Sequence, residues 1–216
     1  MYTSDGEEIK TTMLHPFYVK NVKNGEDETY EIWKASANLV AGDELLTENG
    51  RVVYVEEVRI ERLAESVKVY NLEVEGLHTY YVGSGVLVHN QYAKNNQNSE
   101  ETNENEKLDD DALVVRGGTC TADKFSNGSG VTTDNNGHLN GVSVNSQNGL
   151  SVEELSDGIP NGKIGVTTVG TIRLNGGDVI PSPSKNKPMH ATLFGISAEQ
   201  AELIFNPVIP NPSKDN

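Results

Sequence analysis

Short runs of β-branched and aromatic residues recur through the first 90 positions and predict β-strands, because such side chains fit the pleated surface of a sheet. The runs lie at 17–19, 30–33, 52–55 and 67–74. Asn-Gly pairs at 24–25 and 49–50 fall between them and are typical of tight turns. The pattern therefore predicts an all-β domain over residues 1–90, with Trp33 in its core.

The last hundred residues mix strand and helix patterns. Strand-like runs lie at 112–116, 141–144, 163–169, 171–174 and 191–194. Capping boxes, Ser151 with Glu154 and Ser197 with Gln200, mark the starts of two helices. Residues 179–188 contain three prolines and predict a loop. Residues 112–210 are thus expected to form a small α+β domain with a mainly antiparallel sheet, followed by a tail at 211–216.

The stretch between the two domains, residues 91–111, contains seven acidic and two basic side chains and almost no apolar ones. Such a composition cannot bury enough apolar surface to offset the entropy of an ordered chain. We therefore expect an acidic disordered linker.

Charge bears on possible partners. The chain carries 32 acidic and 17 basic side chains, which disfavours non-specific binding to nucleic acid by the whole chain. Residues 112–216 carry nine acids and seven bases, so a nucleic-acid substrate remains compatible with this part. The sequence contains no apolar run long enough to span a membrane. Its single cysteine, Cys120, excludes an intramolecular disulfide and a Cys-rich zinc site.

The segment at 69–90, VYNLEVEGLHTYYVGSGVLVHN, ends in the pair His89-Asn90. The side-chain amide of an asparagine can attack its own backbone carbonyl, which closes a succinimide and breaks the peptide bond that follows. An adjacent imidazole can polarise the carbonyl and protonate the leaving amine near neutral pH. The pair therefore predicts self-cleavage after Asn90.

Other motifs extend this pattern upstream. Thr12-Met13-Leu14-His15 precedes a Gly42-Asp43 turn and the Val-Tyr-Asn-Leu-x-Val run. Residues 8–90 together resemble the later part of a Hint (hedgehog/intein-type) domain, in particular the pretoxin Hint domain of bacterial polymorphic toxins. The resemblance implies that Thr12 and His15 activate an upstream peptide bond and that His89 and Asn90 form the terminal cyclisation pair.

Two departures from the family pattern change the expected reaction. Hint domains open with a nucleophilic Cys or Ser, but Cys120 lies far downstream, so the Hint domain is expected to be partial. Gln91 has no side chain that could accept an acyl group, so cleavage without ligation is expected. His78, between Gly76 and Tyr80, is interpreted as a turn residue without a chemical role.

Candidate chemistry in the C-terminal domain centres on His190 and Thr192, which a strand places on one face. The imidazole can act as a general acid or base, and the hydroxyl can donate to a phosphate oxygen. Arg116, before two glycines, and Arg173 are candidate phosphate ligands. His138, in a predicted turn, ranks lower, and Lys163 lower still. No metal-ligand cluster or cofactor motif is present, so neither a metal nor a cofactor is expected.

Three functions fit this domain. The first is a metal-independent ribonuclease toxin, with His190 as acid or base and with Thr192, Arg116 and Arg173 stabilising the phosphorane. The second is an ADP-ribosyltransferase toxin that uses Arg116, although the late glutamates, Glu199 and Glu202, fall in a predicted helix. The third is a non-enzymatic binding effector released by the Hint domain.

The toxin-like organisation also implies partners and a location. RNA is the expected substrate and a cognate immunity protein the expected partner, with a monomeric chain and no membrane contact. The N-terminus, MYTSDGEEIK, lacks the pattern of a signal peptide. Secretion or delivery into a target cell, as part of a longer protein used in interbacterial competition, is therefore expected.

Overall fold

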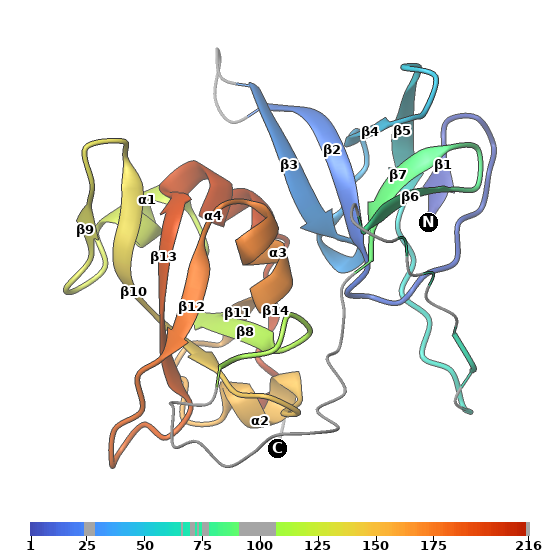
Figure 1. The fold of residues 1–216 in the computed structure, drawn as a ribbon. Coiled ribbons are helices and arrows are strands. Elements are labelled where there is room, and N and C mark those ends of the chain that lie inside the picture. Colours follow the sequence, from blue (N-terminus) through green and yellow to red (C-terminus); the bar gives the residue numbers. More distant parts are fainter. Residues whose placement is uncertain are drawn as a thin grey trace. The chain divides into compact units, whose positions relative to one another are not determined.

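The computed structural model divides into two compact units, residues 1–91 and 92–216 (Figure 1). The structure describes residues 1–23, 29–65, 67–69, 72, 74, 78–90 and 107–214. Within these ranges, each unit contains a single sheet of seven strands. No helix in the described part of the chain is long and apolar enough to cross a membrane.

The N-terminal unit is an antiparallel β structure, which confirms the predicted all-β domain, and it also contains a short 3-10 turn. Its elements are β1 (Tyr2–Thr3), β2 (Pro16–Lys23), β3 (Thr29–Ala35), η1 (Ser36–Asn38), β4 (Glu44–Leu46), β5 (Val52–Glu57), β6 (Thr79–Val82) and β7 (Val86–His89). The strand order is β1-β5-β4-β2-β7-β6, and β3 also pairs with β2. Phe17, Leu45 and Val88 are fully buried between these strands.

Trp33, which is expected in the core of this unit, is only partly buried. The turn at Asn49-Gly50 is present, with the Gly50 N–H donating to the Thr47 carbonyl over 3.0 Å. The predicted turn at 24–25 lies outside the described residues. The strand predicted at 67–74 is wrong for its described residues, 67–69, 72 and 74, which belong to no strand.

The C-terminal unit is a twisted antiparallel sheet with short helices. Its strands are β8 (Leu113–Gly117), β9 (Thr132–Thr133), β10 (His138–Ser146), β11 (Lys163–Thr168), β12 (Asp178–Pro181), β13 (His190–Ser197) and β14 (Ile209–Pro210). Its helices are α1 (Ala122–Ser126), α2 (Val152–Ser156), α3 (Val169–Leu174), α4 (Ala198–Phe205) and η2 (Pro212–Lys214). The strand order is β12-β13-β10-β8-β11-β14, and β9 pairs with β10.

The two faces of this sheet are covered by different helices. On one face, Leu113 and Val115 of β8 pack with Leu155 of α2. Alternation along the strand sends Arg116 to the opposite face, where its guanidinium carbon lies 4.3 Å from the centre of the Phe125 ring of α1. Any site on this sheet therefore belongs either to the α2 face or to the α1 face.

Both capping boxes are present: Ser151 with Glu154 opens α2, and Ser197 with Gln200 opens α4. The strand predicted at 171–174 is wrong, because these residues lie in α3. The Thr168 hydroxyl accepts from the Thr171 N–H over 3.0 Å and caps this helix, and Ile172 is buried beneath it.

The loop predicted at 179–188 begins instead as β12, which runs to Pro181. This strand lies at the edge of the sheet, where a proline at the strand end leaves no internal ladder bond unmade.

The first and last described segments of the C-terminal unit, near residues 108 and 211, pack against the rest of the unit. Leu108, expected in the linker, is 4% exposed, and the neighbouring Asp110 pairs with Arg173. In the predicted tail, Asn211 is buried and its side-chain amide donates to the Asn161 carbonyl over 2.9 Å. The rest of the predicted linker, residues 91–106, lies outside the described residues.

Candidate functional site

Asn90 lies directly after β7 and is almost completely buried, with 2% of its surface exposed. Its backbone N–H donates to the His78 carbonyl over 2.7 Å. Its side-chain nitrogen Nδ2 donates to the Leu72 carbonyl over 2.5 Å, whereas Oδ1 is buried and has no hydrogen-bond partner among the described residues. The nitrogen that would attack the backbone carbonyl is therefore oriented by a backbone acceptor.

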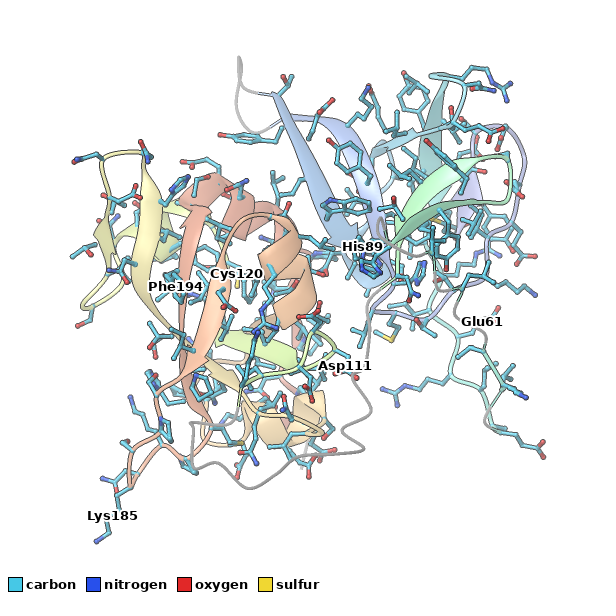
Figure 2. All side chains as sticks on the ribbon, in the orientation of Figure 1. Glu61, His89, Asp111, Cys120, Lys185 and Phe194 are labelled. Carbon is cyan, nitrogen blue, oxygen red and sulfur yellow. The ribbon has the colours of Figure 1, made fainter. Side chains whose placement is uncertain are left out.

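His89 is held among aromatic rings at the end of β7 (Figure 2). Its imidazole meets the Trp33 ring edge-on, with 5.5 Å between the ring centres. The His78 ring lies 6.3 Å away, tilted by 48°. The pairing of Thr79 with His89 across β6 and β7 brings the two imidazoles together.

The structure places His78, which we interpreted from the sequence as a plain turn residue, beside the cyclisation pair. It has a φ of 52°, the only positive φ outside glycine among the described residues. A side chain at positive φ is uncommon, and such strain clusters at functional sites. Neither this backbone conformation nor the contact with His89 has a signal in the sequence beyond the presence of a histidine.

His15 lies next to β2, where its ring contacts Phe17 and Tyr80 with centre distances of 5.8 and 6.1 Å. Burial lowers its pKa below the ordinary value, and the nearby charge of protonated His89 lowers it further. Phe17 pairs with Val88 across β2 and β7, which brings His15 to the same end of the sheet as His89. His15 is consequently suited to exist as a neutral imidazole at pH 7.

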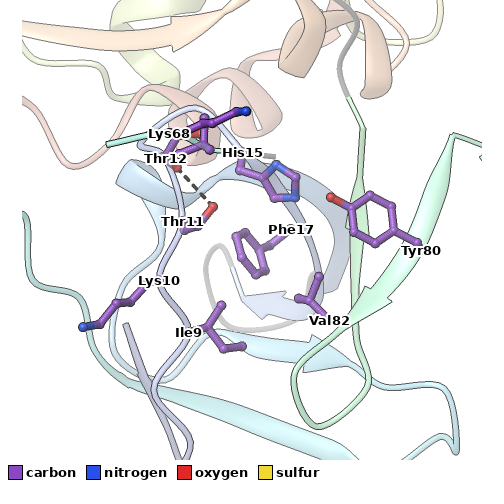
Figure 3. A pocket seen from close by; sticks show the side chains of 10 residues that line it. Ile9, Lys10, Thr11, Thr12, His15, Phe17, Lys68, Tyr80 and Val82 are labelled. Carbon is purple, nitrogen blue, oxygen red and sulfur yellow. Dashed lines mark hydrogen bonds between the residues drawn. The ribbon is translucent and has the colours of Figure 1, made fainter. Parts of the chain in front are cut away.

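Thr12 and His15 both line a pocket of about 440 Å³ in the N-terminal unit (Figure 3). The Thr12 side chain is exposed, and its backbone carbonyl accepts from the Ser36 hydroxyl over 2.6 Å and from the His15 N–H over 3.3 Å. These bonds fix the backbone of the Thr-x-x-His element. The structure thus brings Thr12 to His15, and His15 to the neighbourhood of His89.

A second cluster of polar side chains lies on the α2 face of the C-terminal sheet. Asn145 donates to the Leu155 carbonyl of α2 over 2.8 Å, and His190 lies directly opposite Asn145 on β13. Directly opposed residues of antiparallel strands share a face. Thr192 and Ser143, the next opposed pair on this face, join His190 there.

Hydrogen bonds connect the members of this cluster. His190 Nε2 lies 2.8 Å from Ser143 Oγ, and His190 Nδ1 lies 2.8 Å from Ser182 Oγ. Ser182 Oγ lies 2.8 Å from Thr192 Oγ1. The structure therefore brings the predicted pair His190 and Thr192 together through Ser182, and it adds two serines that the sequence did not single out.

Arg116 does not join this cluster, because it lies on the α1 face of the sheet. Its Nη2 donates to the Lys124 carbonyl over 2.6 Å, and its guanidinium stacks on Phe125. Burial lowers its pKa, which the nearby Cys120 partly offsets. The guanidinium is engaged within its own domain.

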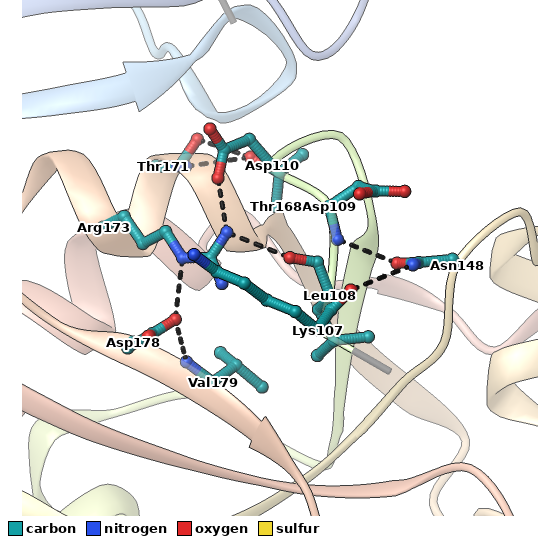
Figure 4. A network of polar contacts seen from close by, with 10 residues as sticks. All are labelled: Lys107, Leu108, Asp109, Asp110, Asn148, Thr168, Thr171, Arg173, Asp178 and Val179. Atoms are coloured by element: carbon teal, nitrogen blue, oxygen red, sulfur yellow. Dashed lines mark hydrogen bonds and ion pairs between the residues drawn. The ribbon is translucent and has the colours of Figure 1, made fainter. Parts of the chain in front are cut away.

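Arg173 is committed to an internal network (Figure 4). Its Nε donates to Asp178 Oδ1 over 2.8 Å, and its Nη1 donates to Asp110 Oδ1 over 2.5 Å and to the Leu108 carbonyl over 3.0 Å. Burial is the largest single influence on the pKa of Arg173 and lowers it. The hydrogen bonds and charges of Asp110 and Asp178 together outweigh burial, so that the pKa is raised. Arg173, which lies on α3, therefore links the segment at 108–110 to β12.

The remaining candidates are separated from His190. His138 lies at the other end of β10, seven residues from Asn145, which corresponds to about 23 Å of strand. Its Nδ1 lies 3.2 Å from Asp134 Oδ2.

Cys120 is 1% exposed, and burial raises its pKa to about 11, so its thiol is protonated and inert near neutral pH.

No group of three or more His, Cys, Asp and Glu side chains within the described ranges could hold a metal ion.

Residues 2–91 match the family model described as the pretoxin HINT domain. Neither a curated protein nor a solved structure matches the chain.

Proposed function

We propose that the chain cleaves itself after Asn90 and releases the C-terminal unit as a toxin effector, because residues 2–91 match the family model of the pretoxin HINT domain. The observation that carries the proposal is the anchoring of the Asn90 side-chain nitrogen on the Leu72 carbonyl, with His89 adjacent. A hydrogen bond that restricts the orientation of the side-chain amide lowers the conformational entropy that cyclisation would otherwise cost.

In the proposed step, Nδ2 of Asn90 attacks the Asn90 backbone carbonyl carbon, a bond from nitrogen to carbon forms, and the peptide bond to residue 91 breaks. One proton leaves Nδ2, and one is delivered to the departing amine. His89 is the proposed donor of the second proton, because an imidazole can carry it near neutral pH.

His78 is the proposed acceptor of the first proton or the group that positions His89. Its ring lies beside His89, and its carbonyl accepts from the Asn90 N–H. Thr12 and His15 remain in the role that their motif implies, activation of an upstream peptide bond.

Mass spectrometry of the purified full chain tests the cleavage. The expected products are residues 1–90, ending in a succinimide or its hydrolysis product, and residues 91–216. Asn90→Ala abolishes cleavage, and His89→Ala slows it by about 10²–10⁴-fold. His138→Ala is the matched control, since this histidine lies in the other unit. Cleavage at the same bond in the Asn90→Ala chain would contradict the proposal.

For the released unit we propose metal-independent cleavage of RNA, with His190 as general base or acid and Thr192 as a hydrogen-bond donor. The contact of both side chains with Ser182 on one face supports this pair. The transition-state role first predicted for Arg116 and Arg173 has less support, because both guanidinium groups are engaged elsewhere.

The alternatives carry less support. An ADP-ribosyltransferase would need Arg116 to hold a nucleotide, and Glu202 is engaged with the Ala122 N–H at 2.7 Å. A binding effector without catalysis needs no particular side-chain cluster. A cognate immunity protein that covers the His190 face, and delivery as part of a longer protein, belong to the same proposal.

Induced expression of the full chain in a bacterial host tests the RNA proposal. Growth arrest with discrete RNA fragments is expected, and His190→Ala abolishes both while His138→Ala leaves them unchanged. Arrest that persists with intact RNA in the His190→Ala strain would favour a binding effector. Transfer of label from NAD to a target would favour ADP-ribosylation.

A further inference from the structure

Ser143 contacts the Nε2 nitrogen of His190, whereas Ser182 contacts the Nδ1 nitrogen on the other side of the ring. Ser143 lies on β10, directly opposite Thr192 of β13, and its side chain is exposed. Its Oγ is 2.8 Å from His190 Nε2, although the two residues are 47 positions apart in sequence. A hydroxyl within this distance of an imidazole has the geometry of an activated nucleophile.

The other ring nitrogen decides which way the proton of this hydrogen bond lies. His190 Nδ1 is 3.0 Å from the Ser182 backbone carbonyl, and a carbonyl can only accept. The neutral tautomer that satisfies this carbonyl carries its proton on Nδ1 and leaves Nε2 as an acceptor. In this tautomer the Ser143 hydroxyl donates to Nε2, which is the direction needed for His190 to take its proton.

Ser182 completes an oriented relay. Its carbonyl and its hydroxyl both face His190 Nδ1, and its hydroxyl also contacts Thr192 Oγ1. The carbonyl thus takes the orienting place that a carboxylate occupies in a Ser-His-Asp triad. Thr192 is left near the reacting atoms as a hydroxyl donor for developing negative charge.

We propose that Ser143 is a catalytic nucleophile activated by His190, and that its substrate is a phosphodiester of a nucleic-acid strand. The substrate class rests on the proposed function of the released unit. Lys185, labelled in Figure 2, lies in the exposed loop between Ser182 and His190. Lys187 belongs to the same loop and is also exposed. Two cations on the loop that carries the relay favour a polyanionic substrate.

The reaction balances without a metal or co-reactant other than water. Ser143 Oγ attacks phosphorus, its proton passes to His190 Nε2, and the bond from phosphorus to the 5′-oxygen breaks as that oxygen takes the proton. Water, deprotonated by His190, then attacks the seryl phosphodiester and frees Oγ. The products carry a 5′-hydroxyl and a 3′-phosphate, and no 2′-hydroxyl takes part.

The first test probes the nucleophile without any nucleic acid. The full chain is treated with a fluorophosphonate, which forms a bond from Oγ to phosphorus with loss of fluoride, and the modified peptide is identified by mass. Modification of Ser143 is expected. It is lost in Ser143→Ala and falls by about 10²–10⁴-fold in His190→Ala. It is retained in Ser126→Ala, where an exposed serine of α1 is removed.

The second test compares one RNA oligonucleotide with its 2′-O-methyl counterpart. The proposal is supported if both strands are cleaved to 3′-phosphate ends and if Ser143→Ala abolishes this cleavage. The Ser143→Ala chain must have the same melting temperature as the unaltered chain. Cleavage of RNA alone, with cyclic phosphate ends and full activity in Ser143→Ala, overturns the proposal and leaves the ribonuclease proposal intact. If neither strand is cleaved, both the ribonuclease proposal and the proposed substrate class are wrong. If the fluorophosphonate does not label Ser143, the proposal that Ser143 is a nucleophile is wrong.

Discussion

Lys34 and Asp43 form an ion pair inside the N-terminal unit, with Lys34 Nζ 2.8 Å from one carboxylate oxygen and 3.0 Å from the other. Their side chains are only 4% and 6% exposed. Asp43 also accepts from the Val40 N–H over 2.9 Å. The pair therefore links β3 to the turn before β4, and removal of one partner leaves a buried charge.

We predict that Lys34→Met lowers the free energy of unfolding of this unit by about 3–5 kcal/mol. Lys20→Met is the control, because its ion pair with Glu31 spans 3.7 Å at the surface and contributes less than about 1 kcal/mol. Urea unfolding followed by the fluorescence of Trp33, the single tryptophan, measures both in an Asn90→Ala background. Equal losses in the two variants would contradict the prediction.

The lowered pKa of His15 predicts a pH-dependent stability of the same unit. Between its folded pKa and the ordinary value of 6.5, the unfolded chain binds more protons than the folded unit. The contribution to stability is thus full above about pH 6.5 and declines as the pH falls through that value. His15→Gln should reduce this slope in unfolding curves recorded from pH 8 to 5. The slope should persist in His138→Gln, and an unchanged slope in His15→Gln would refute the assignment.

Gly165 on β11 has no room for a side chain. An added Cβ would lie 2.7 Å from the Phe205 carbonyl and would collide with Cys120 Sγ. Gly165→Ala is therefore predicted to destabilise the C-terminal unit by about 1–3 kcal/mol through overpacking. Gly162→Ala is the matched control, since a Cβ added there would meet no atom within 4 Å. Calorimetry of both variants measures the difference, and similar melting temperatures would count against the packing.

Arg173→Lys should loosen the C-terminal unit, because an ammonium group cannot reproduce the fork that reaches Asp110, Asp178 and the Leu108 carbonyl. We expect the free energy of unfolding to fall by about 1–3 kcal/mol. Because the buried Cys120 thiol reacts only when the unit opens, its alkylation should become about 5- to 150-fold faster. The exposed exchange Lys185→Arg should leave the alkylation rate unchanged. An unchanged rate in Arg173→Lys would show that the network contributes little.

Several elements could be predicted from the sequence alone, because they depend on interactions between residues close together in the chain. The capping boxes at Ser151 and Ser197 open helices because each side chain satisfies backbone groups within one turn. The strands at 113–117 and 163–168 follow from runs of β-branched residues. The terminal pair His89-Asn90 is a chemical unit by itself, since the two residues are neighbours in the chain.

Other elements were decided by a missed local signal or by long-range packing. Residues 171–174 have the composition of a strand but form a helix, because Thr168 caps it locally and Ile172 is buried within the unit. The sequence determined which side chains can act, because acidity, nucleophilicity and local hydrogen bonding belong to residue types. Only the tertiary structure decided which of them meet, by pairing Ser143 with His190, placing His78 beside His89 and turning Arg116 to the opposite face. Alternation along a strand is local and by itself places His190 and Thr192 on one face, but which strands pair, in which register and beneath which helix depends on contacts between distant segments.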